Sequence, residues 1–80
     1  MAEPYIDKTL DCSGLACPLP LAKTNRAVKE MQSGQILEMI ATDANAMLDM
    51  EAWAKQTRNE LLLAQKQDDG KFRFLIRKGS

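Results

Sequence analysis

The residues best suited to chemistry in this chain are a cysteine and the two prolines that follow it, in Cys17-Pro18-Leu19-Pro20. The apolar run from Ile6 to Leu10 precedes them and predicts a strand, whereas Leu21 to Met31 predicts a helix. Proline is well tolerated in the first turn of a helix, so Pro18 indicates the helix start and leaves Cys17 at its mouth. Unpaired N–H groups and the positive end of the helix dipole favour a thiolate there, which makes Cys17 a candidate reactive thiol.

Cys17 and the residues around it also have interpretations in which they serve the structure and not the chemistry. For Cys17 itself the alternative is a buried structural cysteine. Cys12 is interpreted as a small apolar residue at a strand end; the alternative is a resolving thiol that forms a disulfide with Cys17 if their Cα atoms approach within roughly 7 Å. Asp11 has two interpretations of equal weight: it accepts N–H groups of the following turn, or it has a catalytic role. Gly14 suits a tight or left-handed turn.

Hydrophobic periodicity predicts the elements that position the thiol. A loop at 11–16 and turns at 42–45 and 68–70 separate them. Two amphipathic helices of this length cover one face of a four-stranded mixed sheet, so the order β-α-β-α-β-β predicts a two-layer α/β sandwich. The expected strands and helices are Tyr5–Leu10, Pro18–Met31, Ile36–Ala41, Ala46–Thr57, Leu61–Gln65 and Lys71–Arg77.

Composition excludes several classes of function. The 80 residues are expected to form one domain, 1–80, and the 11 basic and 11 acidic residues argue against bulk nucleic-acid binding. No run approaches the roughly 20 apolar residues of a membrane span, and the start of the chain lacks the pattern of a secretory signal, so a cytoplasmic protein with reduced cysteines is expected. Without histidine, Cys–His hydrolase chemistry is excluded, and a metal site is not expected.

The pattern Asp11-x-x-Gly14-x-x-Cys17-Pro18-x-Pro20 resembles the signature of the TusA/SirA-type small sulfur carriers. The resemblance extends over some seventy residues, through Thr42-Asp43, Asn59-Glu60 and the closing run from Phe74 to Gly79. It implies a β-α-β-α-β-β sandwich in which Cys17 carries sulfane sulfur as a covalent persulfide, without another cofactor. It also implies a donor (a cysteine desulfurase, a rhodanese or a related sulfurtransferase) and an acceptor sulfurtransferase. The family's branches serve tRNA thiolation, cofactor biosynthesis or dissimilatory sulfur oxidation.

The sequence also offers candidate docking residues and two competing functions. Lys23 and Arg26, one and a half to two turns into the first helix, are candidates to meet an acidic partner, and Asp43 is interpreted as the cap of the second helix with a possible docking role. Two other functions stay open: a thiol redox switch that uses Cys12 and Cys17, and a docking module that binds through the uncovered sheet face. Whether the chain counts as an enzyme depends on definition, because turnover of a carrier requires other proteins.

Overall fold

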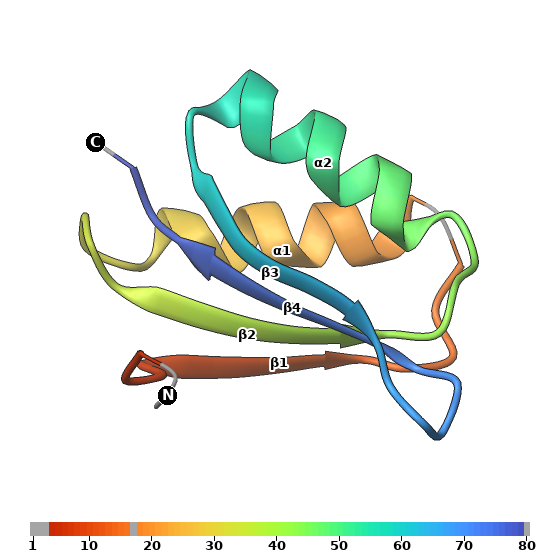
Figure 1. Ribbon diagram of the computed structural model, residues 1–80. Helices are drawn as coiled ribbons and strands as arrows, with labels where there is room; N and C mark the ends of the chain where they lie inside the picture. Colours follow the sequence, from red (N-terminus) through yellow and green to blue (C-terminus); the bar gives the residue numbers. More distant parts are fainter. Residues whose placement is uncertain (1–3, 17, 80) are drawn as a thin grey trace.

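The computed structural model describes residues 4–16 and 18–79, and within them the predicted two-layer sandwich is confirmed. The sheet has four strands in the order β1-β2-β4-β3; β1 is parallel to β2, and the other pairs are antiparallel. Figure 1 shows both helices on one face of this sheet. The elements are β1 (Lys8–Cys12), α1 (Leu19–Lys29), β2 (Ile36–Ala41), α2 (Ala46–Thr57), β3 (Glu60–Lys66) and β4 (Phe72–Arg77).

The first strand lies further along the chain than predicted. Tyr5 was expected to open it, yet Tyr5 is exposed and β1 runs from Lys8 to Cys12. The reason is the parallel pairing with β2, which aligns Lys8 with Leu37 at one end and Cys12 with Ala41 at the other. Asp11 and Cys12 therefore belong to the strand and not to the loop in which the sequence pattern placed them.

The boundaries of α1 also differ from the prediction. The helix begins at Leu19, with Pro18 as its cap residue and Pro20 in its first turn, and it ends at Lys29. Met31, predicted as its last residue, lies beyond the helix but is still buried. The Glu30 and Met31 N–H groups bond to the carbonyls of Ala27 and Val28, in the tighter pattern that ends many helices.

The core lies between the sheet and the helices and follows the predicted pattern. Helix α2 buries the four residues expected of it, and β4 turns Phe74 and Ile76 toward the helices. Methionine fills much of the remaining space, as its flexible side chain allows. The fully or almost fully buried side chains are those of Phe74, Leu37, Met39, Met50, Ile76, Thr24 and Cys12.

The sheet face without helices is covered by its own charged side chains. Arg73 Nε lies 2.5 Å from a Glu38 carboxylate oxygen, and Arg77 pairs with Glu60. Beneath these cross-strand pairs, Leu75 on β4 is only 2% exposed. Charged side chains therefore cover part of the apolar surface of this face.

The last described residues tie β4 to the ends of both helices. The Lys78 ammonium donates to the carbonyl oxygen of Met31, just beyond α1. The Gly79 N–H donates to Asn59 Oδ1 at 2.9 Å, and a Cβ on Gly79 would lie 2.0 Å from the Arg58 carbonyl oxygen. Glycine at 79 is thus required by close approach. Among the described residues, no helix has the length and apolar character needed to cross a membrane.

Candidate functional site

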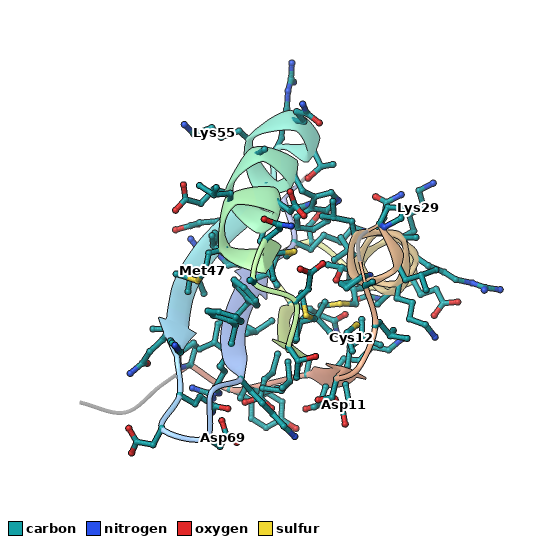
Figure 2. All side chains as sticks on the ribbon, turned by 90° about the vertical axis from the view of Figure 1, so that its right-hand side faces the viewer. Asp11, Cys12, Lys29, Met47, Lys55 and Asp69 are labelled. Carbon is teal, nitrogen blue, oxygen red and sulfur yellow. The ribbon has the colours of Figure 1, made fainter. Side chains whose placement is uncertain are left out.

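The candidate site lies where the end of β1 meets the start of α1. Cys17, the predicted reactive residue, lies outside the described residues, but both of its chain neighbours, Ala16 and Pro18, are exposed. Leu19, the first residue of α1, is 49% exposed. The segment on either side of Cys17 is therefore a surface loop that leads directly into a helix. Figure 2 views the molecule from this end, with Asp11 and Cys12 labelled at the end of β1.

Asp11 stabilises the turn that leaves β1, as predicted. Its Oδ1 atom accepts a hydrogen bond from the Ser13 N–H at 2.9 Å. The Ser13 hydroxyl first, and then this N–H, lower the pKa of the Asp11 carboxyl below its ordinary value, and Lys71 adds a smaller effect of the same sign. The geometry therefore places Asp11 as the acceptor that holds this turn.

Gly14 connects this loop to the loop that precedes α2. Its N–H donates to Thr42 Oγ1 at 2.8 Å, and its φ of +79° lies in the region that glycine adopts readily. The bond joins two loops that are 28 residues apart in the chain and brings the starts of both helices to one end of the molecule. The glycine of the motif thus has a specific positioning function.

Removal of the Thr42 hydroxyl is expected to loosen this connection. Thr42→Val keeps the branched shape but leaves the Gly14 N–H without its acceptor, which lowers the free energy of unfolding by about 0.5–1.5 kcal/mol. Hydrogen exchange of the Gly14 amide, followed by NMR, measures the effect directly. Thr42→Ser keeps the hydroxyl and is the matched control; equal exchange rates in both variants would show that the bond does not hold the loop.

The first turn of α1 offers a thiolate fewer hydrogen-bond donors than a typical helix start. The Leu19 N–H already donates to the Ala16 carbonyl at 2.9 Å, and Pro20 has no N–H. Two of the first three helical residues are thereby removed as donors, contrary to the expectation of a helix mouth lined with unpaired N–H groups. The helix dipole, which remains although these two residues offer no donor, is what favours an anion here.

Cys12 belongs to the core, as the favoured interpretation predicted. Its side chain is fully buried at the end of β1, among the residues that pack under the helices. Burial raises the pKa of the Cys12 thiol above its ordinary value, and the charge of Lys23 offsets only part of that effect. A protonated, enclosed thiol is a poor nucleophile, which weighs against the redox switch.

The three predicted docking residues lie on two sides of the helix mouth. Asp43 is not the cap of α2: Asn45 occupies that position, and the Asp43 carboxylate accepts the Asn45 N–H at 3.0 Å within the preceding turn. Asp43 lines a small apolar cavity between the starts of α1 and α2. Lys23 and Arg26 lie on the other side of α1, beside β1. The residues that line the small cavity are Pro20, Leu21, Asp43, Ala46, Asp49 and Met50.

Sequence reasoning missed the two exposed leucines beside the site. Leu19 and Leu48 lie in the first turns of α1 and α2, and Leu48 is 72% exposed. The available signal was their position in the first turn, outside the apolar stripe of each helix. In residues 4–16 and 18–79, no cluster of three acidic or cysteine side chains is placed to hold a metal ion.

Comparison with known proteins agrees with this arrangement. Residues 8–78 match the family described as sulfurtransferase TusA. The sulfur carrier protein TusA of Allochromatium vinosum is 50% identical over 72 residues, which cover 90% of this chain and 93% of that protein. The SirA-like protein of Desulfitobacterium hafniense, at 19% identity, shares the fold with a TM-score of 0.80 over 91% of this chain and 99% of its own. This chain belongs to the TusA family of sulfurtransferases.

Proposed function

We propose that this protein accepts sulfane sulfur as a persulfide on Cys17 and passes it to an acceptor protein. The observation that carries the proposal is that Ala16 and Pro18, the chain neighbours of the motif cysteine, are exposed directly before α1. Membership of a family whose relative is named a sulfur carrier supports the general role. The burial of Cys12 leaves Cys17 as the cysteine suited to exchange.

The chemistry requires two thiol–disulfide-type exchanges and no net redox change. The Cys17 thiolate attacks the terminal sulfur of a donor persulfide; a new S–S bond forms on Cys17, the donor S–S bond breaks, and the donor leaves as a thiolate. An acceptor thiolate then attacks the outer sulfur of the Cys17 persulfide. The S–S bond on Cys17 breaks, and Cys17 is released as a thiolate. The transferred sulfur keeps its oxidation state throughout. The persulfide itself is therefore the only group that the carrier holds.

The fold supplies the electrostatic conditions for this exchange. The dipole of α1 favours negative charge just before its first turn and lowers the pKa of a thiol there. It favours the persulfide anion for the same reason. Leu19 and Pro20 contribute no free N–H to this effect, because the Leu19 N–H donates to Ala16 and Pro20 has none.

The partners follow from the chemistry. The donor must present a protein persulfide, as a cysteine desulfurase or a rhodanese-type sulfurtransferase does, and the acceptor must present a thiolate. We place the exchange in the cytoplasm, where thiols stay reduced. The exposed Leu19 and Leu48, in the first turns of α1 and α2, provide apolar contacts for either partner.

Sulfur loading tests this proposal. The reduced protein is incubated with inorganic polysulfide, freed of excess reagent, alkylated and digested with trypsin, which leaves both cysteines on one peptide, residues 9–23. Fragmentation of that peptide in the mass spectrometer assigns the added sulfur to one cysteine. A gain of one sulfur on Cys17, lost again when a thiol acceptor is added, is the expected result. No sulfur gain, or a gain confined to Cys12, would overturn the assignment.

A further inference from the structure

A groove runs between α1 and the edge strand β1, on the side of the molecule away from α2. Its floor is apolar, from Leu10 of β1 and Ala27 of α1, and its walls are charged. Figure 2 looks toward the start of α1 and shows β1, which ends at the labelled Cys12, on the same side of the molecule. We call this the α1–β1 groove; its lining residues are Lys8, Leu10, Lys23, Arg26, Ala27 and Glu30.

The walls of the groove carry an excess of positive charge. Lys8 lies 3.2 Å from the Glu30 carboxylate, so these two charges compensate each other. Lys23 and Arg26 are exposed, and no carboxylate among the described residues forms an ion pair with either. The protein as a whole is neutral, so this local excess is a property of the groove and gives it complementarity to negative charge.

The backbone along the groove is suited to an extended ligand. β1 is an edge strand, paired only with β2 within the described sheet, and an edge strand presents N–H and C=O groups to an added strand. The strand ends at Cys12, and the loop that contains Cys17 follows directly. A segment laid along β1 is therefore led toward the reactive loop.

The opposite edge of the sheet also has a groove, but without an excess of positive charge. This second groove lies between α2 and β3; Glu60 is paired with Arg77 there, and Glu51 and Lys55 balance each other. An acidic segment is therefore attracted to β1 rather than to β3, although both strands are edges. This difference in charge selects one groove and one kind of ligand.

We propose that the α1–β1 groove binds an extended acidic segment of the protein that exchanges sulfur with this chain, with Lys23 and Arg26 holding its carboxylates and Leu10 and Ala27 its apolar side chains. The proposal rests on the proposed function, since it names the surface by which a sulfur-exchange partner docks. The residues that recognise the segment are distinct from the cysteine that reacts.

Peptide titration tests the groove. ¹⁵N-labelled protein is titrated with a short synthetic peptide of alternating glutamate and valine, and its NMR spectrum is followed. The expected shifts affect the amides of β1 and those of Lys23 and Arg26, and they weaken as salt is added. The double variant Lys23→Glu/Arg26→Glu is expected to bind at least about tenfold more weakly, because attraction becomes repulsion at two sites.

The double variant Lys55→Glu/Lys66→Glu provides the matched control, because it also replaces two cations by two carboxylates, but beside the other edge strand. It is expected to leave peptide affinity unchanged. Equal affinity of the wild type and the double variant, or shifts centred on β3, would overturn the proposal, as would equal binding of a peptide of alternating lysine and valine. The titration measures binding without sulfur, whereas polysulfide loading measures sulfur without a partner, so the failure of either proposal is recognised separately.

Discussion

Cys17→Ser is expected to abolish sulfur loading completely, and the Cys12 that remains is expected to stay unmodified while the protein is folded. The first result follows from the loss of the only cysteine suited to exchange. The second follows from the full burial of Cys12 in the core. Intact-protein mass spectrometry after incubation with polysulfide, and separately with iodoacetamide, measures both, and circular dichroism confirms that the variant is folded.

The protection of Cys12 has an expected size. If alkylation requires unfolding, its rate falls by the fraction of molecules that are unfolded, roughly 10³-fold or more for a domain stable by about 5 kcal/mol. In denaturant the same thiol should react at once. The matched variant Cys12→Ala should load sulfur like the wild type. A disulfide that requires both cysteines, or sulfur found on Cys12 in folded Cys17→Ser, would instead support the redox switch.

The burial of Cys12 also predicts how the stability of the protein depends on pH. Burial raises the pKa of the Cys12 thiol, so the folded state favours the protonated form. The resulting contribution to stability is fully present below the ordinary pKa of a thiol and is lost as the pH rises through the raised value. Urea unfolding in alkaline buffers should therefore show a loss of stability in the wild type that is absent from Cys12→Ala.

Local sequence patterns predicted the elements with strong periodicity. The bounds of β2 and α2 agree with the prediction at both ends, because an apolar run of strand length and the turn residues at 42–45 require no other part of the chain to be recognised. β1 was misplaced for the opposite reason. Lys8, Thr9 and Asp11 give it little apolar character, and its bounds come from parallel pairing with β2.

The features of the candidate site also fall into two groups, those that depend on neighbouring residues and those that depend on residues far apart in the chain. The candidate cysteine and the turn-forming Asp11 follow from a short motif, because the signals for both lie in neighbouring residues of the chain. The burial of Cys12, the bond from Gly14 to Thr42 and the α1–β1 groove depend on contacts between residues far apart in sequence. Lys78 shows the same limit of prediction from local sequence. The pattern around it suggests a surface cation, whereas its ammonium donates to the Met31 carbonyl just beyond α1.

Phe74→Ala is expected to have the largest effect on stability in this protein. The ring is fully buried in the middle of β4, between Met39 of β2 and Ala64 of β3, and it faces the helices. Its removal leaves a cavity that the surrounding side chains cannot fill, at a cost of about 3–5 kcal/mol in the free energy of unfolding. That is a large part of the total stability of a domain of this size.

Urea unfolding of Phe74→Ala, with the milder Phe74→Leu in case the first variant does not fold, measures this effect. Leu75→Ala is the matched comparison, because Leu75 is the next residue of β4 and is also buried, but on the face covered only by charged side chains. Water and the flexible Arg73 side chain can fill the space it leaves, so the expected cost lies near the lower end of the 2–5 kcal/mol range. Because Cys12 shares the core with Phe74 and not with Leu75, alkylation of Cys12 should accelerate more in the Phe74 variants. Equal losses of unfolding free energy in both series would show that the two sheet faces contribute alike to stability. Equal acceleration of Cys12 alkylation would show that the helix-covered core does not by itself protect this thiol from reaction.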